Sequence, residues 1–523
     1  MKPALPSPAT ANPEPGGRLP ALWAAAAVLC LSWAVQAPAL ASGSDSASSP
    51  AALLQPCRLR GVKHEALCGK VERALDPSRP GGPKIDVHFA VLLALARHKK
   101  PDPVFFLAGG PGQSAISLAG VLSGSMNRLG MRRDIVLVDQ RGTGRSAPLH
   151  CPEPEPSASL ADATDLSRIA ARLQACREAL QKLPHGDLRH YTTTVAMADL
   201  EAVRAALGAD NINLVGGSYG TRAALEYLRQ HPQRVRRTLL DGVAPPDMVL
   251  PASFSADAQA ALDAVLAACE KEATCAARHP QLRSRWAAML ARLPQPAEVP
   301  HPVTGRPERI TLTRETLTGL VRPVLYAPAL AAALPLALDE ATQGRYAALV
   351  GLASTFAGGR NSPMRMAEGM HFSVICSEDM PRLRSGGAVD APGVDFKDDF
   401  AGTYRRVCEG WPQGSVPEAF YKVPTAPSPV LVMSGGADPV TPPRHGQRVV
   451  QALGDKARHV VVPQAGHGLM MHGCMSDAVF RFIDAEDDAQ ALKVDTACAE
   501  KVPRPPAYAL PGAASAPARG ASR

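Results

Sequence analysis

Aromatic residues and long runs of one charge are scarce in this chain of 523 residues. Phe, Trp and Tyr together make up 4% of it, and a formal net charge of +8 is spread over 56 basic and 48 acidic side chains. No basic stripe interleaved with aromatic residues is present, so we expect no nucleic-acid partner. The composition, 46% hydrophobic and 20% charged, is that of a globular protein with a large core.

An apolar run long enough to span a membrane is also absent near the amino terminus. Residues 19–35 are apolar, but a spanning helix needs roughly 20 such residues. Arg18 precedes the run, and Ala41 ends a small-x-small cleavage pattern after it. We therefore predict a signal peptide over residues 1–41 rather than a membrane anchor. The protein would be exported, periplasmic or secreted, without membrane contact beyond that segment.

Ten cysteines remain once the signal peptide is removed, and none of them has the spacing of zinc ligands. An even number in an exported chain favours disulfides. The five neighbouring pairs, taken in order, all close short loops, and we predict these pairs: Cys57–Cys68, Cys151–Cys176, Cys269–Cys275, Cys376–Cys408 and Cys474–Cys498. With Cys474 oxidised, the nearby His467 and His472 lack a thiolate partner, so we expect no metal.

The feature that organises the chain is the stretch 211–222, NINLVGGSYGTR. Its first five residues are largely apolar and stop at glycines, which predicts a short buried strand. After Ser218, apolar residues recur at helical spacing up to His231-Pro232. A serine between a strand and a helix is held in a tight turn, with its hydroxyl exposed at the carboxyl end of the sheet. The alternative is a glycine-rich turn whose serine only caps the helix.

Strand and helix patterns alternate on both sides of that stretch. We expect strands at residues 84–96, 104–107, 135–138, 235–240, 429–433 and 459–462, and helices at 165–182 and 194–207. Strands separated by helices of this length predict an α/β fold, with a mostly parallel, doubly wound sheet that carries helices on both faces. Ligands of such sheets bind at the carboxyl ends of the strands.

The strand signals fade between residues 248 and 426, where Ala- and Leu-rich helical stretches dominate. We therefore divide the chain into six parts. They are the signal peptide 1–41, a flexible lead-in 42–55, a first core part 56–247, an inserted helical cap 248–426, a second core part 427–501 and a disordered tail 502–523.

Three strand ends carry the residue types of a nucleophilic hydrolase. Ser218, Asp438 and His467 each follow an apolar strand, which predicts that they meet at one edge of the sheet. A neutral histidine activates a serine hydroxyl near pH 7, and an acid fixes the histidine tautomer. Other histidines compete for this role, but only His467 follows a strand and lies between glycines. The alternatives are a surface-loop histidine and an aspartate that only forms a turn.

Acyl transfer also needs hydrogen-bond donors for the oxyanion. The Tyr219 N–H is one candidate, because it follows the expected nucleophile. The other should come from the loop at residues 109–112, where Pro111 has no N–H. Gly110 is our first choice and Gly112 the reserve.

Six short motifs of the chain, taken together, resemble those of a known family. GGPGQS, DQRGTGRS, GGSYGTR, LDGV, GADPVTP and AGHG together are similar to those of α/β-hydrolases of the proline iminopeptidase and tripeptidyl aminopeptidase type. Members of that family are serine exopeptidases that release residues from peptide amino termini. The resemblance covers about residues 85–247 and 365–500, and it implies an α/β-hydrolase fold with an inserted helical cap.

Carried over by position, the resemblance implies a catalytic set and an oxyanion hole. Ser218, Asp438 and His467 are the implied catalytic residues. Gly110 and Tyr219 are the implied oxyanion hole. The two paired cysteines after the histidine resemble the tripeptidyl aminopeptidase-like C-terminal region, which favours that branch of the family.

An exopeptidase must bind a free ammonium group, which calls for carboxylates near the site. Glu378 and Asp379 are our candidates, and the alternative is two solvated acids at a helix end. We predict an exported serine hydrolase that cleaves residues or short peptides from peptide amino termini through an acyl-enzyme on Ser218, without a cofactor. The rival hypotheses are an esterase that acts on small acyl esters with the same residues, and a non-catalytic binding protein on a hydrolase scaffold.

Overall fold

The computed structural model describes residues 53–355, 362, 365–384, 393–397 and 399–509. The predicted signal peptide, most of the predicted lead-in and residues 510–523 of the predicted tail lie outside the described residues. The elements given below all belong to one structural unit, residues 48–523. In its described part, no helix combines the length and the apolar character needed to cross a membrane.

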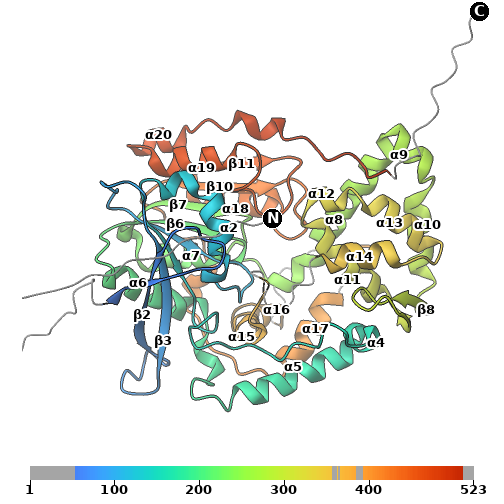
Figure 1. Cartoon of the computed structure of the whole chain (residues 1–523), viewed down its shortest axis with the longest axis horizontal. Helices are drawn as coiled ribbons and strands as arrows, with labels where there is room; N and C mark the ends of the chain where they lie inside the picture. The colour runs from blue at the N-terminus through green and yellow to red at the C-terminus, as the bar shows by residue number, and fades with distance from the viewer. Residues whose placement is uncertain (1–52, 356–361, 363–364, 385–392, 398, 510–523) are drawn as a thin grey trace, which may run out of the picture. The chain divides into compact units, whose positions relative to one another are not determined.

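The described part contains a nine-stranded sheet (Figure 1). Its strands are β1 (Gln55–Cys57), β2 (Ala66–Ala74), β3 (Lys84–Leu92), β4 (Val104–Leu107), β5 (Ile135–Val138), β6 (Ile212–Gly217), β7 (Val235–Asp241), β10 (Val430–Gly435) and β11 (Ala457–Val462). They lie in the order β1-β2-β3-β5-β4-β6-β7-β10-β11. β1, β2, β3 and β5 pair antiparallel, and every pair from β5 to β11 is parallel. The predicted α/β fold with a mostly parallel sheet is therefore confirmed.

Helices cover both faces of this sheet. One hydrophobic cluster joins Phe105 and Leu107 of β4 to helices on one face, and a second joins Val104 and Phe106 to helices on the other. The first set is α5 (Leu166–Leu180), α6 (Thr193–Ala206) and α7 (Tyr219–Gln230), and the second is α2 (Ala119–Ser125), α3 (Asn127–Gly130), α19 (Met475–Asp484) and α20 (Asp488–Leu492). Side chains alternate along a strand. Burial on both faces therefore explains why the strands are continuous apolar runs.

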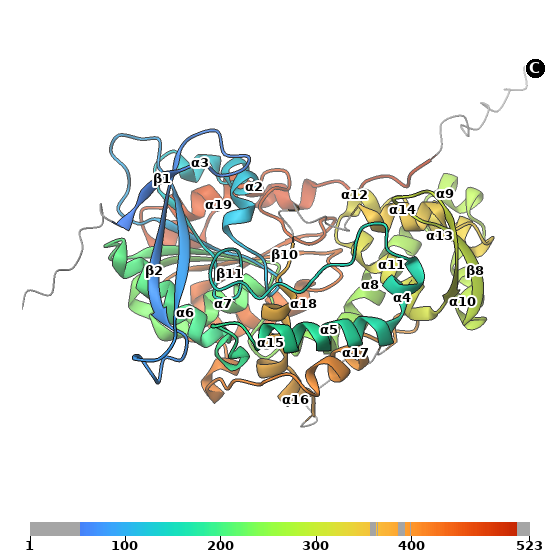
Figure 2. The same cartoon turned by 60° about the horizontal axis from the view of Figure 1, so that its bottom comes forward.

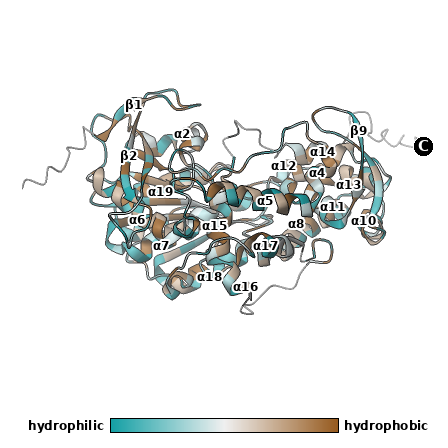
Figure 3. Cartoon of the chain, turned by 90° about the horizontal axis from the view of Figure 1, so that it is seen from below, coloured by the Kyte–Doolittle hydropathy of each residue, from teal (hydrophilic) through white to brown (hydrophobic). Residues whose placement is uncertain are grey.

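The helix α5 shows how such a covering helix is built. Hydrophobic and hydrophilic residues alternate around it (Figure 3). Its buried residues Leu173, Cys176 and Leu180 are three and four positions apart, and all three belong to the first cluster. This spacing places them on one stripe of the helix, which packs against the core while the other side meets solvent.

Residues 250–354 form a helical group with a core of their own (Figures 1 and 2). The helices are α8 (Leu250–Lys271), α9 (Ala273–Arg278), α10 (Leu282–Ala291), α11 (Arg314–Leu325), α12 (Pro328–Ala331), α13 (Leu334–Thr342) and α14 (Ala347–Ser354). Their shared cluster is built around Trp286, Leu317 and Leu338. An antiparallel hairpin, β8 (Gln295–Pro300) with β9 (Pro307–Leu312), interrupts the helices and was not predicted.

The later helices of the predicted cap pack differently. α15 (Glu368–Glu378) and α17 (Asp399–Cys408), with α16 (Met380–Arg384) between them, contribute Met370, Ile375 and Val407 to the first sheet cluster. The segment 248–426 therefore divides between a cluster of its own and the core, and its boundaries as a domain stay a prediction. The remaining α-helices are α4 (Leu160–Thr164) and α18 (Pro443–Leu453).

All five predicted disulfides are present. They join Cys57 to Cys68, Cys151 to Cys176, Cys269 to Cys275, Cys376 to Cys408 and Cys474 to Cys498. The Cys376–Cys408 bond ties α15 to α17, and the Cys151–Cys176 bond anchors α5.

Candidate active site

Ser218 lies in a sharp turn between β6 and α7. Its backbone has φ 55° and ψ −125°, a combination that costs a non-glycine residue about 1–3 kcal/mol. The Ser218 N–H donates to Asp241 O at 2.9 Å, and Thr221 Oγ1 donates to Ser218 O at 2.6 Å. These bonds hold the strained turn in the way expected for a serine exposed between a strand and a helix.

Two glycines let α7 approach the sheet at this turn. A Cβ at Gly216 would lie 2.4 Å from Gly220 O, and a Cβ at Gly220 would lie 2.0 Å from Leu107 O. Both contacts are with backbone, which cannot rotate aside as a side chain can. The G-x-S-x-G pattern at residues 216–220 is therefore required by packing, and its predicted strand-turn-helix context is present.

Asp438 and His467 form a hydrogen-bonded pair in the loops after β10 and β11. His467 Nδ1 donates to Asp438 Oδ2 at 2.7 Å, and Thr441 Oγ1 donates to the same oxygen at 2.7 Å. The other oxygen, Asp438 Oδ1, accepts the N–H groups of Val440 and Thr441, each at 2.9 Å. Because Nδ1 carries the proton, the neutral imidazole presents Nε2 as a proton acceptor.

Burial and pairing have opposite effects on this imidazole. Burial disfavours the charged ring, but the charge and hydrogen bond of Asp438, with the charge of Asp241, raise the pKa of His467 above its usual value. Burial by itself would raise the pKa of Asp438, but the charge of His467 and the hydrogen bonds from His467 and Thr441 hold it below its usual value. The pair is therefore arranged to stabilise an imidazolium beside a carboxylate.

Asp241, at the end of β7, joins the turn of the serine to the loop of the histidine. Its carbonyl accepts the Ser218 N–H, and its carboxylate accepts the Leu469 N–H at 2.8 and 2.9 Å from the two oxygens. The next residue, Gly242, packs on the imidazole, since a Cβ there would lie 3.2 Å from His467 Cε1. Ser218 and His467 thus both contact the segment Asp241–Gly242. This segment lies at the carboxyl end of β7, the edge of the sheet at which the sequence predicted Ser218 and His467. The LDGV motif was noted in the sequence, but no role was assigned to Asp241.

The loop after β4 lies against the same serine. A Cβ at Gly109 would lie 3.1 Å from Ser218 Cβ. The next residue, Gly110, has φ 110°, which favours glycine. The structure therefore places Gly110 and Tyr219, the two predicted oxyanion donors, on backbone segments that both adjoin Ser218.

Asp379 does not face a space where a substrate amine could bind. Its side chain is buried and pairs with Arg222, whose Nη1 lies 3.0 and 3.1 Å from the two carboxylate oxygens. The carboxylate also accepts the Leu250 N–H at 3.0 Å. A bound ammonium would have to displace a buried guanidinium, which would then be left without its partner charge.

Glu378 is also buried, in a chain of hydrogen bonds that reaches Tyr219. Thr193 donates to it twice, from N to Oε1 at 2.6 Å and from Oγ1 to Oε2 at 2.9 Å. Tyr219 Oη in turn donates to Thr193 Oγ1 at 2.6 Å. Burial raises the pKa of Glu378 to about 8. The contacts that the structure shows for Glu378 and Asp379 are internal to the fold, and their role in binding a substrate ammonium stays a prediction. Both support the first turns of α7, which follow Ser218.

Tyr326 and His371 contact the site, and the sequence analysis did not select them. Tyr326 packs its ring edge-on against His467, with ring centroids 5.1 Å apart, and its carbonyl accepts the His467 N–H at 3.0 Å. His371 Nδ1 donates to Pro111 O at 3.0 Å, and its Nε2 accepts from Tyr404 Oη at 2.8 Å. Neither residue follows a strand or belongs to a motif, so no local signal marks them.

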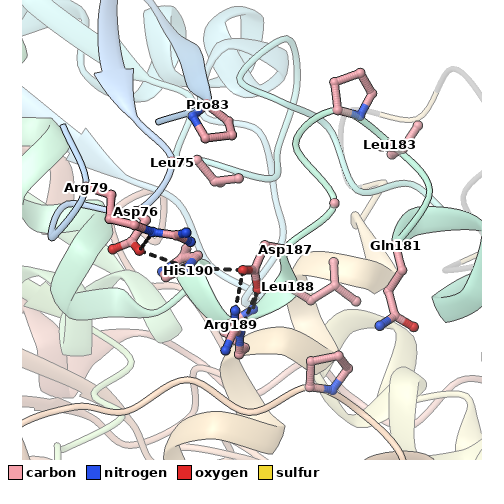
Figure 4. Close-up of a pocket in the computed structure, with 13 residues that line it drawn as sticks. Leu75, Asp76, Arg79, Pro83, Gln181, Leu183, Asp187, Leu188, Arg189 and His190 are labelled. Carbon is pink, nitrogen blue, oxygen red and sulfur yellow. Dashed lines mark hydrogen bonds and ion pairs between the residues drawn. The ribbon is translucent and has the colours of Figure 1, made fainter. Parts of the chain in front are cut away.

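A cavity of about 430 Å³ is lined by a different set of residues (Figure 4). In it His190 Nε2 lies 3.8 Å from Asp76 and 3.3 Å from Asp187, and Arg79 and Arg189 pair with the same two acids. None of the predicted site residues lines this cavity. Across the described segments, no group of three or more His, Cys, Asp or Glu is arranged to hold a metal ion.

Two family models match the chain: the alpha/beta hydrolase fold over residues 102–331 and the TAP-like protein over residues 394–498. The chain is 33% identical to the serine protease Hip1 of Mycobacterium tuberculosis over 209 residues, or 37% of this chain and 39% of that protein. It is 30% identical to the tripeptidyl aminopeptidase of Streptomyces coelicolor over 190 residues (34% and 35%). It is 32% identical to the proline iminopeptidase of Neisseria meningitidis over 146 residues (27% and 34%).

The matched segments span less than half the length of each of these relatives. The model matches nevertheless agree with two independent features of the structure: the mostly parallel nine-stranded sheet and the strand-turn-helix at residues 212–230. The chain therefore has the alpha/beta hydrolase fold, followed by a C-terminal region that matches the TAP-like protein model.

Proposed function

We propose that this α/β-hydrolase is an exported serine exopeptidase, which cleaves residues or short peptides from the amino terminus of peptides through an acyl-enzyme on Ser218. The observation that carries the proposal is the Asp438–His467 pair at the same sheet edge as the strained Ser218 turn. The peptidase part draws support from relatives named tripeptidyl aminopeptidase and proline iminopeptidase.

Acylation begins when Ser218 Oγ attacks the peptide carbonyl and His467 Nε2 takes the hydroxyl proton. Asp438 stabilises the imidazolium that forms. The N–H groups of Gly110 and Tyr219 stabilise the negative carbonyl oxygen, and such a donor typically contributes about 2.7–4 kcal/mol to the transition state. His467 then gives its proton to the leaving amine, the C–N bond breaks, and an ester on Ser218 remains.

Deacylation uses the same groups with water as the nucleophile. His467 takes a proton from the water, which attacks the ester, and returns that proton to Ser218 Oγ as the acid is released. The two steps need only side chains and backbone of this chain, so the mechanism requires no cofactor.

A substrate comparison tests the proposal. Aminoacyl or tripeptidyl arylamides with a free amine are expected to have a higher kcat/KM than the same compounds with an acylated amine and than simple aryl esters. A peptide-library digest read by mass spectrometry, with Ser218→Ala as the control, would show how many residues are released. Preference for blocked or ester substrates would contradict the exopeptidase and favour the esterase.

Export draws support from the five disulfides, because disulfides persist in oxidising compartments. The apolar segment at residues 19–35 adds to this. Sequencing the amino terminus of the protein recovered outside the cytoplasm is expected to start at Ser42. A mature chain that retains residues 1–41 would contradict the cleaved signal peptide.

A further inference from the structure

A basic cavity of about 700 Å³ is bordered by the loop after β4 and by residues 58–61 of the amino-terminal segment. Its volume is in the usual range for small-molecule sites, about 300–1,000 Å³. Five of its lining side chains are basic: Arg58, Arg60, Arg145, His150 and Arg365. The proposed chemistry on Ser218 uses none of them.

Arg365 is neutralised by Glu153, whose Oε1 lies 2.5 Å from Arg365 Nε, and burial lowers the pKa of His150, so the exposed arginines carry most of the positive charge. The acid in the cavity wall compensates little of that charge. Asp139 is 2% exposed, and its carboxylate accepts a hydrogen bond from Ser114 Oγ at 2.6 Å. Burial also raises the pKa of Asp139.

Arg58 and Arg145 are both exposed, and within the described ranges neither guanidinium group forms an ion pair. The hydrogen bond that Asp139 accepts from Arg145 comes from the backbone N–H of that arginine. Their guanidinium groups are therefore available to an anionic ligand.

The cavity lies one short loop away from the nucleophile. Gly112 and Ser114 form part of its wall, and Gly109, at the other end of that loop, packs against Ser218. The Gln113 N–H donates to Gly109 O at 3.3 Å, so the loop is a closed turn. Extended peptide covers about 3.3 Å per residue. Three extended residues beyond the scissile bond therefore span at least the three residue steps from Gly109, beside Ser218, to Gly112 in the cavity wall.

We propose that this basic cavity binds a carboxylate in the part of the peptide that leaves after acylation. The inference rests on the proposed exopeptidase function, and it narrows the substrate class to short peptides with a carboxylate a few residues beyond the scissile bond. Guanidinium groups pair with carboxylates through two parallel N–H···O bonds. Every unblocked peptide carries such a group at its carboxyl terminus, and acidic side chains offer the same chemistry.

The arginines would act on substrate binding rather than on the chemical step. The carboxylate they hold keeps its charge while the distant carbonyl reacts, so it is bound equally in the ground state and the transition state. Such binding lowers KM and does not change kcat. Because both guanidinium groups are exposed, salt screens the attraction, and the preference for a carboxylate should weaken as ionic strength rises.

The kinetic test compares tetra-alanine and hexa-alanine, each with a free terminal carboxylate, with their carboxyl-terminal amides, so that release of one residue from the first or of three from the second leaves three residues beyond the scissile bond. For the wild-type protein we expect a KM about tenfold lower for the free acid, the size of one exposed charge-assisted contact. In the double variant Arg58→Gln with Arg145→Gln, the ratio of the two KM values should fall towards one. The control is Arg234→Gln. It removes an exposed arginine just before β7, at the amino-terminal end of that strand and so at the end opposite to Ser218, and it should keep the wild-type ratio.

A third peptide of each length, the amide with Glu as its last residue, distinguishes the two sources of the carboxylate. A KM like that of the free acid would mean that a side-chain carboxylate is bound as well, and a KM like that of the amide would mean that the terminal carboxylate is required. Either result agrees with a carboxylate site. Equal KM values for free acid and amide in the wild type, or a ratio that the double variant leaves unchanged, would overturn the proposal.

Calorimetric binding to the Ser218→Ala protein separates this inference from the proposed function. If the wild type cleaves none of these peptides, the exopeptidase proposal fails, but the preference for the free acid in binding still tests the cavity. That preference should be lost when Arg58→Gln and Arg145→Gln are added to Ser218→Ala. Equal dissociation constants for the free acid and the amide would remove the carboxylate site.

Discussion

The proposed mechanism depends on the negative charge of Asp438, which orients and stabilises the ring of His467. In Asp438→Asn the amide no longer fixes the Nδ1–H tautomer, so kcat should fall by about 10⁴. The lost negative charge also lowers the pKa of His467. The residual kcat/KM should then rise with pH at a lower pH than in the wild type, where it rises through a pKa above the usual His value of about 6.5.

The matched control for this prediction is Asp477→Asn, which changes an exposed aspartate on α19 that pairs with Arg128. Full pH profiles of kcat/KM with a free-amine arylamide would show both effects. A variant at Asp438 that keeps more than about a tenth of the wild-type kcat would contradict the assigned role.

Local sequence was sufficient to place three candidate site residues at one sheet edge, and it was insufficient to show the surroundings of Glu378. Ser218, Asp438 and His467 follow buried strands, and parallel strands bring their carboxyl ends to one edge, so a local pattern carries spatial information. Glu378 has no such relation to its partner, because Thr193 lies 185 residues away in the chain. Whether an acid at a helix end meets solvent, substrate or an internal donor is decided by packing, which the pattern does not contain.

At the scale of elements, α7 is anchored to the end of α15 by the buried Arg222–Asp379 pair. Both side chains are almost fully buried, at 1% and 2% exposure. Asp379→Asn removes one charge and leaves the guanidinium unpaired. We expect the free energy of unfolding to fall by about 3–5 kcal/mol, measured by urea denaturation.

The control for this pair is Asp263→Asn, whose partner Arg283 and own side chain are both over two fifths exposed. An exposed pair contributes at most about 1 kcal/mol. Equal losses of stability in the two variants would show that the α7–α15 contact does not depend on the buried charge pair.

Most strands of the sheet could be predicted to within two residues at their ends. β4 and β5 match their predicted ranges, because four consecutive apolar residues between polar turns leave little choice of boundary. The β8–β9 hairpin was missed. Both of its strands contain proline, which argues against a strand in sequence but is tolerated where strands form a two-stranded edge.

At the scale of the whole molecule, Glu378 couples global stability to pH. Burial holds its pKa at about 8 in the folded protein, against a usual value of 4.5. Between these two pH values the folded state keeps a proton that the unfolded chain releases, so the free energy of unfolding decreases as pH rises through this window. Glu378→Gln removes this component. The variant should therefore gain stability relative to the wild type on going from pH 5 to pH 8.

Urea denaturation of both proteins at pH 5 and pH 8 checks this sign. Glu298→Gln, which removes an exposed acid on β8, should keep the pH dependence of the wild type. The same pH dependence in the Glu378 variant and the wild type would mean that this carboxyl does not hold its proton in the folded state.

The fold class of the whole chain could be predicted from sequence, and the internal division of the cap region could not. Alternation of strands and helices fixes a doubly wound sheet, because few connections are compatible with it. By contrast, α15 contains neither Ala nor Leu, but its apolar residues give no local sign of the core that they join. Its place in the sheet cluster depends on partners such as Leu180 and Tyr191, which are far from it in sequence.

Peptide mapping by mass spectrometry after treatment with a fluorophosphonate tests the central claim most directly, namely that Ser218 is a nucleophile activated by the Asp438–His467 pair. The account predicts a single phosphonyl adduct, located on Ser218, absent in Ser218→Ala and formed much more slowly in Asp438→Asn. An adduct on another serine of the folded wild-type protein, or none on Ser218, would contradict it.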